Sequence, residues 1–452
     1  MTDLLISAAQ RASRYLSEID NRTVFPSSEA VDRLTQLDTL LPEEPSDPET
    51  VLTLLDEIGS PATVATTGGR YFGFVTGGSL PATVAANWLA GAWDQNGGLY
   101  VMSPTAATIE QIALRWLLDV LGLPPESDGG FVTGATMANF TGLAAARHAI
   151  LHKQGWNVET QGLFGAPPIT VVVGDEVHVS ILKALSMLGL GYERVIRVPV
   201  DGQGRMRANA LPELDASTIV CIQAGNVNTG AFDPAAEICA AAHEAGAWVH
   251  VDGAFGLWAA VAPERAHLVA GVSQADSWAT DAHKWLNVPY DSGLAFCRHP
   301  KDMQTAMSTA AAAYLVQGNE RIPYDYTPEF SRRARGIEVW AALRSLGRSG
   351  LAQMIERTCQ HATRFAKGLR AAGYQVLNQV ELNQVLVSFG DVETTRRVMA
   401  TVQADGTCWC GGTVWQGRTA MRISVSSWAT TEADVERSLE AILRIAAKQS
   451  AP

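Results

Sequence analysis

The sequence predicts an α/β protein whose large domain contains a mostly parallel β-sheet. From about Gly68 onward, short β-rich runs alternate with Ala- and Leu-rich helical stretches, as in "ITVVVGDEVHVSILKALSML". The β-runs are almost continuously apolar, which is typical of strands buried on both faces. Because strand–helix units repeat along the chain, we expect right-handed crossovers and helices on both faces of the sheet.

Three consecutive segments are predicted. Residues 1–70 form an N-terminal helical segment, interrupted by the proline-rich turn "LPEEPSDPET". Residues 71–325 form the large domain. Residues 326–452 form a smaller C-terminal α+β domain, which closes with a helix from Thr431 to about Lys448.

The composition suits a globular protein with a large core. The 452 residues are 47% hydrophobic and 18% charged, with a net charge of −12 and no Lys/Arg block, so we expect neither nucleic acid nor an anionic membrane as a partner. We find no signal-peptide pattern and no apolar run of about 18 residues. The chain is therefore expected to be soluble and cytoplasmic.

The cysteines do not have the spacing of a metal site. No CxxC pair occurs, and the "CWC" stretch has no matching His/Cys cluster. We therefore expect no metal and predict buried free thiols at Cys221, Cys239, Cys297, Cys359, Cys408 and Cys410.

The candidate chemistry lies where strands end, because ligands of open α/β sheets bind beyond the carboxyl ends of the strands. The strand in "AWVHVDGAFG" ends at Asp252, a carboxylate that needs a cation or donors when buried. Lys284 follows in "SWATDAHKWLNVPYDSG", beside His283 and between two tryptophans. Taken alone, Asp252 has a less favoured alternative as a helix cap or a structural ion pair.

An aspartate after one strand and a lysine after a later strand suit a pyridoxal 5′-phosphate enzyme. The lysine forms a Schiff base with the cofactor, and the carboxylate keeps the pyridine nitrogen protonated. Formation of the imine also removes the fixed ammonium charge from an apolar setting. We therefore predict Lys284 and Asp252 as catalytic residues and cofactor contacts.

A phosphate-binding turn is predicted in "GGFVTGATMANFTGL", where Gly134, Ala135 and Thr136 lie between a strand and a helix. Backbone N–H groups at the helix N-terminus and the Thr136 hydroxyl would bind the phosphate, and His283 could add a donor. An ordinary βα turn is the alternative.

His178 is the third strand-end candidate, in "VVVGDEVHVSILKAL". An imidazole there could stack on the pyridine ring and act as a general acid or base. The alternative is a structural histidine that only makes hydrogen bonds.

These elements, in this order, resemble the group II pyridoxal-dependent decarboxylases, which include aromatic-L-amino-acid and glutamate decarboxylases. The "DAHKW" motif carries most of the resemblance, and "VHVDGAFG", "GDEVHVSILKAL" and "QAGNVNTGAFD" fit the same family. The resemblance runs from about Tyr71 to the C-terminus. It implies a type I aminotransferase-like fold, pyridoxal 5′-phosphate, an amino-acid substrate, and a homodimer with active sites at the interface.

The resemblance also implies roles for individual residues. Lys284 would bear the Schiff base, Asp252 would meet the pyridine nitrogen, and His178 and Ala254 would lie on opposite faces of the ring. The phosphate would be bound by Ala135, Thr136 and His283, beside Gly134. Asn226 would lie near the cofactor oxygen or the substrate carboxylate. The candidate substrate contacts are Arg422, Tyr71, Phe72, Asn96, Tyr100 and Trp285.

Two departures from the family pattern concern the reaction. Asp281 stands where the family usually has Asn, three residues before the lysine. The loop "AAYLVQGNERIPYDYTPEFSRRARG" is several residues shorter than the family's mobile loop, whose tyrosine protonates the α-carbon. Relatives in which that tyrosine is changed tend towards decarboxylation coupled to oxidative deamination. The tyrosines of the loop in this chain are Tyr314, Tyr324 and Tyr326.

We predict decarboxylation of an aromatic or apolar L-amino acid through an external aldimine and a quinonoid. The carboxylate bond breaks when it is held perpendicular to the conjugated plane. The alternatives are aminotransfer, aldol-type cleavage of a β-hydroxy amino acid, and oxidative deamination that gives an aldehyde. A non-catalytic binding protein is disfavoured because Lys284, Asp252 and His178 are all present.

Overall fold

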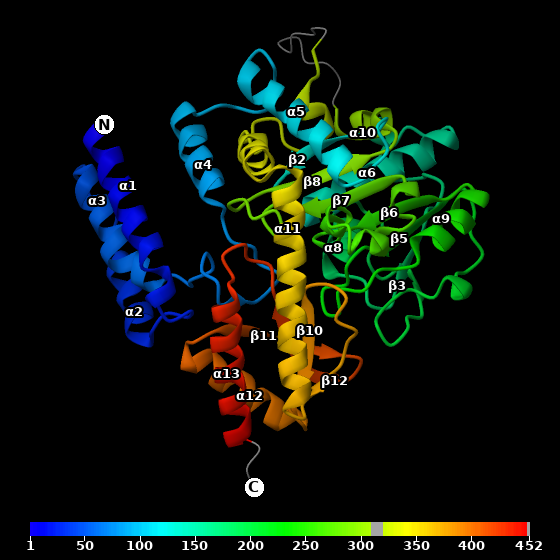
Figure 1. Cartoon of the computed structure of the whole chain (residues 1–452). Coiled ribbons are helices and arrows are strands. Elements are labelled where there is room, and N and C mark those ends of the chain that lie inside the picture. The colour runs from blue at the N-terminus through cyan, green and yellow to red at the C-terminus, as the bar shows by residue number, and fades with distance from the viewer. Residues whose placement is uncertain (309–319, 450–452) are drawn as a thin grey trace. The chain divides into compact units, whose positions relative to one another are not determined.

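The computed structural model describes residues 1–308 and 320–449. Its chain forms two compact units that are each discontinuous in sequence (Figure 1). The small unit comprises Met1–Gly78, Arg364–Leu377 and Val385–Pro452, and the large unit comprises Ser79–Thr363 and Asn378–Gln384. The boundary predicted near residue 325 therefore falls inside the large unit.

A seven-stranded sheet in the order β2-β8-β7-β6-β5-β3-β4 forms the centre of the large unit. Strand β8 runs antiparallel to β2 and β7, and the other neighbours are parallel, which confirms the predicted mostly parallel sheet. All residues of β5, β6, β7 and β8 are buried, as expected for interior strands of a mostly parallel sheet. The strands are β2 (Asp128–Val132), β3 (Thr170–Gly174), β4 (Ile196–Val198), β5 (Thr218–Gln223), β6 (Trp248–Asp252), β7 (Ser277–Asp281) and β8 (Gly293–Cys297).

The helix α6 (Ala135–Lys153) lies against the sheet and contacts β7 and β8. Its Leu143 and Ile150 belong to the main core cluster, together with Val173 of β3. Glycine at position 142 allows the helix to lie close to the sheet, because a Cβ at this position would lie only 2.7 Å from the His250 ring. The other α-helices of the large unit are α4 (Pro81–Trp93), α5 (Pro104–Val120), α7 (Val158–Gln161), α8 (Val179–Met187), α9 (Ala235–Glu244), α10 (Pro300–Met307) and the first part of α11 (Gly336–Ala371).

The small unit has a five-stranded sheet in the order β1-β11-β12-β10-β9. Strand β1 is the pair Tyr71–Phe72, which the sequence placed at the start of the large domain but which pairs in parallel with β11. The other strands are β9 (Gln375–Val376), β10 (Gln384–Ser388), β11 (Trp409–Trp415) and β12 (Arg418–Ser424). The helices are α1 (Thr2–Ser17), α2 (Ser28–Asp32), α3 (Pro48–Leu54), α12 (Val392–Asp405) and α13 (Glu432–Gln449).

The last helix, α13, begins where its capping sequence predicts. The Thr431 amide donates to the Asp434 carboxylate at 3.0 Å, and the Asp434 amide donates to the Thr431 hydroxyl at 3.2 Å. This reciprocal pair satisfies N–H groups that have no partner inside the helix.

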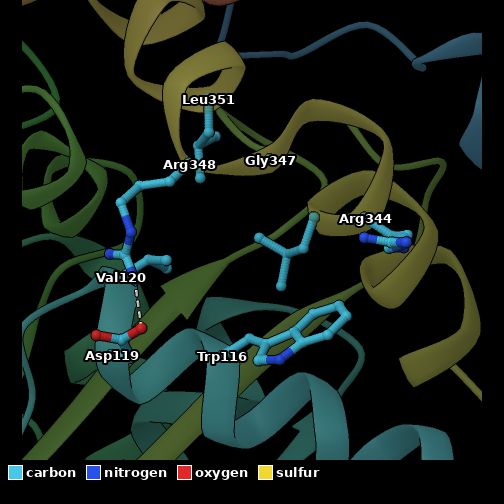
Figure 2. A pocket seen from close by; sticks show the side chains of 8 residues that line it. Trp116, Asp119, Val120, Arg344, Gly347, Arg348 and Leu351 are labelled. Atoms are coloured by element: carbon cyan, nitrogen blue, oxygen red, sulfur yellow. Dashed lines mark hydrogen bonds and ion pairs between the residues drawn. The ribbon is translucent and has the colours of Figure 1, made fainter.

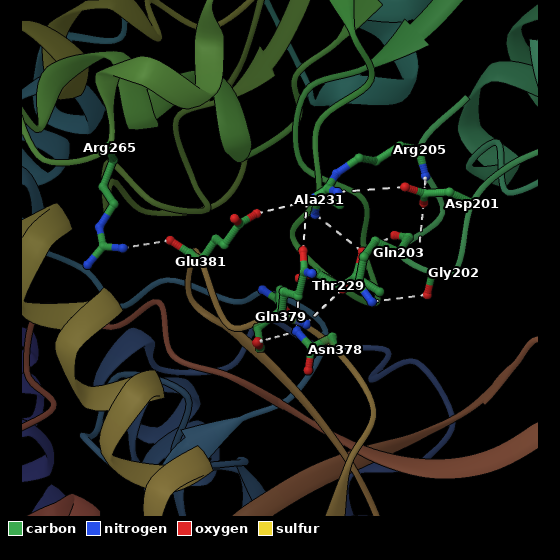
Figure 3. A network of polar contacts seen from close by, with 11 residues as sticks. Asp201, Gly202, Gln203, Arg205, Thr229, Ala231, Arg265, Asn378, Gln379 and Glu381 are labelled. Carbon is green, nitrogen blue, oxygen red and sulfur yellow. Dashed lines mark hydrogen bonds and ion pairs between the residues drawn. The ribbon is translucent and has the colours of Figure 1, made fainter. Parts of the chain in front are cut away.

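A polar network attaches residues 378–384 to the large unit (Figure 3). Arg205 donates to the Gln379 side chain at 3.1 Å and to the Glu381 carboxylate at 2.9 Å. Arg265 donates to the Glu381 carbonyl at 2.8 Å. These bonds join residues more than a hundred positions apart, so the membership of this segment could not be predicted from local sequence.

All six cysteines are buried and free, as predicted. Within residues 1–308 and 320–449, no helix combines the length and the apolar character that a membrane span needs.

Candidate active site

A cavity opens at the carboxyl ends of the parallel strands of the large unit. Gln223 ends β5 and Asp252 ends β6, and the two residues are paired across the strands. His178 follows β3 and Lys284 follows β7. The cavity is lined by His178, Gln223, Gly225, Val227, Asp252, Ala254, Phe255 and Lys284.

Lys284 has a counter-ion inside the chain. Its Nζ lies 2.8 Å from Oδ2 of Asp281, and the two side chains are 19% and 2% exposed. Burial disfavours the ammonium, but the charge and hydrogen bond of Asp281 outweigh it and raise the pKa of Lys284 above its ordinary value. The residue that departs from the family pattern is thus the ion-pair partner of the predicted catalytic lysine.

Asp252 is held by neutral donors. Its Oδ1 accepts from the Ala254 amide at 3.2 Å, and its Oδ2 accepts from the Ser180 hydroxyl at 3.3 Å and from Asn139 Nδ2 at 3.2 Å. Dipoles of this kind stabilise the carboxylate without neutralising it. A cation in the cavity, such as a protonated pyridine, can still pair with this carboxylate.

His178 makes structural hydrogen bonds and also lines the cavity, so its stacking on the pyridine ring stays a prediction. It is the N-cap residue of α8, where Nδ1 accepts from the Ser180 amide, and its side chain lines the cavity. The same Nδ1 lies 2.8 Å from the Ser180 hydroxyl oxygen, which also lies 3.3 Å from Asp252 Oδ2. Ser180 therefore links the candidate ring-stacking residue to the candidate pyridine partner.

Asn139 extends this network into the core. Its Oδ1 lies 2.9 Å from His250 Nε2, while its Nδ2 donates to Asp252. His250 is fully buried, and burial lowers its pKa to about 3, so the imidazole is neutral at ordinary pH. Asn139 and Ser180 were not predicted from the sequence. The available signal was a polar side chain in the first helix after a strand, Asn139 on α6 and Ser180 on α8.

The turn between β2 and α6 contains the predicted phosphate-binding residues. Helix α6 begins at Ala135, Thr136 is its second residue, and a Cβ on Gly134 would lie 3.2 Å from the His283 ring. The His283 Nδ1 accepts from the Ser292 amide at 3.1 Å, which leaves Nε2 to carry the proton of the neutral ring. Gly134, Ala135 and His283 are therefore neighbours in the structure, as a shared phosphate requires.

Two buried polar atoms near this edge of the sheet lack partners among the described residues, the Ser292 hydroxyl and Asn226 Nδ2. Asn226 Oδ1 accepts from the Asn228 and Thr229 amides, so its carbonyl side holds the loop. Polar atoms of this kind are available to a ligand or to an ordered water. Ser292 was not predicted, because nothing in the local sequence marks a serine that precedes an antiparallel strand.

Three substrate candidates lie in the large unit but make other contacts. Trp285 is fully buried, and its indole donates to Thr358 of α11 at 2.9 Å. Asn96 Oδ1 accepts from the Gly98 amide at 2.9 Å within its own loop. Tyr100 is 39% exposed on the same loop.

The other three candidates belong to the small unit. Tyr71 stacks on Trp409 with ring centroids 5.2 Å apart, and Phe72 packs edge-on against Phe365 at 5.1 Å. Arg422 lies on β12, and burial lowers its pKa. Tyr71 and Phe72 pack within this unit, and the substrate role of all three residues stays a prediction.

The described loop tyrosines are held in the interior. Tyr326 is buried beneath the Arg321 guanidinium, 3.9 Å from its ring centroid, and burial raises the pKa of the Tyr326 phenol to about 12. Tyr324 is also buried and stacks on Phe330. The third candidate, Tyr314, lies outside the described residues.

The fold and this site define a class. A mostly parallel sheet with a lysine, an aspartate and a histidine at its carboxyl edge, beside a helix N-terminus, is the arrangement of a type I pyridoxal-phosphate enzyme. The model of the pyridoxal-dependent decarboxylase conserved domain matches residues 32–391. The chain therefore belongs to the pyridoxal-dependent decarboxylase family and is a pyridoxal-phosphate-dependent amino-acid decarboxylase, as its motifs implied.

Named relatives agree with this assignment. The aromatic-L-amino-acid decarboxylase of Bacillus atrophaeus is 26% identical over 377 residues, which cover 80% of this chain and 76% of the relative. The phenylacetaldehyde synthase of Petunia hybrida is 27% identical over 354 residues, 73% of this chain and 68% of the relative. The solved structure of Oryza sativa TDC with PLP and tryptamine has the same fold, with a TM-score of 0.92 at 22% identity over 100% of this chain and 98% of that chain.

Proposed function

We propose that this decarboxylase acts on an aromatic or apolar L-amino acid, with its chemistry centred on Lys284. The observation that carries the proposal is the cavity that Lys284, Asp252, His178 and Ala254 line together. Phe255 lines the same cavity and adds an apolar wall. The aromatic substrate class draws further support from the named relative of Bacillus atrophaeus.

In this proposal the cofactor is held at four points. Lys284 would bind its aldehyde carbon, Asp252 its pyridine nitrogen, and His178 and Ala254 the two faces of its ring. The Ala135 amide, the Thr136 hydroxyl, His283 Nε2 and the unpartnered Ser292 hydroxyl would bind its phosphate. When bound, pyridoxal phosphate supplies an electron sink for the electron pair of the bond that breaks.

The protein then has to select the bond to the carboxylate. That bond breaks only when it is perpendicular to the conjugated system, so a cationic or amide donor has to hold the carboxylate out of plane. Arg422 and Asn226 are the candidates. Asn226 Nδ2 is buried and has no partner among the described residues, so it can donate without breaking an existing bond.

Proton return to the α-carbon is assigned to Lys284 or His178. Both line the cavity, whereas the described tyrosines Tyr324 and Tyr326 are buried and engaged elsewhere. The same observation favours a second candidate function, decarboxylation coupled to oxidative deamination, in which dioxygen would be the oxidant and the products would be the aldehyde, CO2, ammonia and hydrogen peroxide. The match to the phenylacetaldehyde synthase of Petunia hybrida supports this second candidate.

We further propose that the chain acts as a homodimer whose active sites are completed by the partner subunit. The loop with Asn96 and Tyr100 is the candidate contribution to the partner's site. Aminotransfer and aldol-type cleavage use the same cofactor and differ only in the bond that the site holds perpendicular.

The test is incubation of the cofactor-loaded protein with a panel of aromatic, apolar and acidic L-amino acids. We expect CO2 from the aromatic or apolar members, with either the amine or the aldehyde as the second product. Release of keto acid without CO2, or no CO2 from any member, would contradict the proposal.

Lys284→Ala should abolish the visible absorbance band of the bound cofactor and lower the rate of CO2 release at least about a thousandfold. Lys183→Ala is the matched control, because Lys183 is an exposed lysine on α8. An unchanged band in Lys284→Ala would show that another group holds the cofactor.

A further inference from the structure

The Asp281 side chain contacts the turn that is predicted to bind the phosphate. It is the last residue of β7, and its side chain is 2% exposed. Its Oδ1 accepts from the Ala135 amide at 2.5 Å and lies 3.6 Å from His283 Nε2, while its Oδ2 lies 2.8 Å from Lys284 Nζ. One buried carboxylate thus contacts two predicted phosphate donors and the predicted cofactor lysine.

The sheet register explains this position. Asp281 of β7 lies opposite Gly293 of β8, and Gly293 lies opposite Val132 of β2, so the three residues form one row. Helix α6 begins three residues after Val132. A side chain at Gly293 would prevent the approach, because a Cβ there would lie 2.5 Å from the Gly134 Cα.

The chemistry at this point favours an anion. The first N–H groups of a helix have no partner within the helix and carry a positive partial charge, so they bind carboxylate or phosphate oxygens. Asp281 presents a full negative charge to the Ala135 N–H. The asparagine that is usual in the family would present a neutral oxygen and would not compete as an anion.

We propose that Asp281 is a positioning residue that acts as an internal anion, which the cofactor's phosphate displaces from the Ala135 N–H. The proposal rests on the proposed function, because it takes Ala135 and Lys284 as cofactor contacts. Before loading, Asp281 pairs with Lys284 and fixes the N-terminus of α6. When the cofactor binds, its phosphate would accept the hydrogen bond from the Ala135 N–H in place of Asp281. The nearby Asp281 carboxylate would then repel the phosphate.

A consequence is weak discrimination between pyridoxal phosphate and pyridoxal. Both aldehydes meet the same Lys284 amine, so the effect of Asp281 on that amine is common to both. Only the phosphorylated form has to displace Asp281 from the helix N-terminus. The ratio of the two dissociation constants, pyridoxal over pyridoxal phosphate, therefore isolates the contact between Asp281 and the phosphate.

The experiment titrates cofactor-free protein with each aldehyde and follows the visible absorbance band. For Asp281→Asn we expect this ratio to rise at least about tenfold over the wild type, because a buried charge near the phosphate is removed. Asp281→Ser, which also lacks the charge, should raise the ratio in the same direction and is the second variant if Asp281→Asn does not fold. Thermal unfolding of each variant checks that it is folded.

Asp252→Asn is the matched control. It also removes a buried carboxylate near Lys284, but one that faces the ring common to both aldehydes, so the ratio should stay within about threefold of the wild type. A ratio that is unchanged in the Asp281 variants would overturn the role of Asp281. Absence of an absorbance band with either aldehyde in the wild type would instead overturn the proposed site.

Discussion

The imidazole of His250 lies at the inner end of the hydrogen-bonded chain that leads to Asp252. Its Nε2 lies 2.9 Å from Asn139 Oδ1, and its Nδ1 lies 2.8 Å from the Ser277 hydroxyl. Because Asn139 Oδ1 can only accept, Nε2 carries the proton and Nδ1 accepts from Ser277. This arrangement turns the amide donor of Asn139 towards Asp252, so a buried core histidine helps to position the candidate partner of the pyridine nitrogen.

The protonation of His250 links the stability of the fold to pH. Burial lowers the pKa of the folded imidazole from 6.5 to about 3. Between these values the unfolded chain binds a proton that the folded chain does not, so stability is lost as pH falls through this window. We expect the free energy of unfolding to fall by roughly 1 kcal/mol per pH unit from this residue as the pH drops from 6.5 towards 3.

Urea unfolding at several pH values would measure this loss. His250→Gln removes the titrating ring, so its stability should depend less on pH over the same window than that of the wild type. His267→Gln is the control, because His267 is exposed, and it should keep the wild-type pH dependence. Equal pH dependence in the wild type and His250→Gln would show that His250 does not titrate as inferred.

The sequence predicted the site residues that end a strand or follow one within a few positions. Lys284, Asp252, His178 and Ala254 meet in one cavity because parallel strands bring their carboxyl ends to one edge. The direction in which a side chain points after a strand end cannot be predicted from the sequence in the same way. Trp285 is next to Lys284 in sequence, yet its indole binds Thr358 on a helix more than seventy residues later.

At the scale of elements, α11 contains a kink that one glycine makes possible. Gly347 has φ +60° and ψ 178° inside the helix, a conformation that is strained for any residue with a Cβ. The kink borders a cavity of about 270 Å³ between α11 and α5, where Arg348 pairs with Asp119 and Trp116 lies on the facing helix (Figure 2). The kink therefore shapes the surface of the large unit at this point.

Gly347→Ala should lower the free energy of unfolding by about 1–3 kcal/mol, because the new Cβ meets backbone strain rather than a clash. Gly350→Ala is the matched control three residues later. Its Cβ would lie 3.6 Å from Leu346 Cβ, an ordinary contact, so this substitution should raise stability by about 0.5–1 kcal/mol. Urea unfolding of both variants gives the comparison, and equal effects would contradict the inferred strain.

The strands of the large sheet and the helices around it could be predicted from sequence, because each one is defined by local hydrophobic periodicity. Which segments belong to each of the two units could not be predicted in this way. Strand β1 pairs with β11, whose sequence is more than three hundred residues away, and residues 378–384 are attached to the large unit by Arg205 and Arg265. Such pairings depend on long-range contacts that no local pattern encodes.

At the scale of the whole molecule, uncovered apolar surface supports the proposed homodimer. Helix α4 and the segment after it expose large apolar side chains in one stretch of the large unit. Soluble proteins rarely leave contiguous apolar surface to water unless it is an interface. The exposed residues are Trp88, Leu89, Trp93, Tyr100, Val101 and Met102.

Under the proposed homodimer, a second copy of the chain covers this exposed stretch. Tyr100 belongs to this exposed stretch, and Asn96 holds its loop through the Gly98 amide, yet neither lines the cavity of its own chain as described. In a two-fold dimer the same patch of both subunits meets, so the two copies of this loop would lie at the interface, where the proposal has each contribute to the partner's site. Dimerisation and catalysis should then be lost together.

Leu89→Arg tests this coupling. Leu89 is 54% exposed, so an arginine should not disturb the fold of one subunit, but at the interface it would bury an unpaired charge. We expect light scattering to give a dimer for the wild type and a monomer for Leu89→Arg, with a decarboxylation rate at least about tenfold lower. Phe164→Arg is the control, because Phe164 is a large apolar residue that is 97% exposed outside this stretch. It should leave mass and activity unchanged, and a wild-type protein that is monomeric and active would refute the shared site.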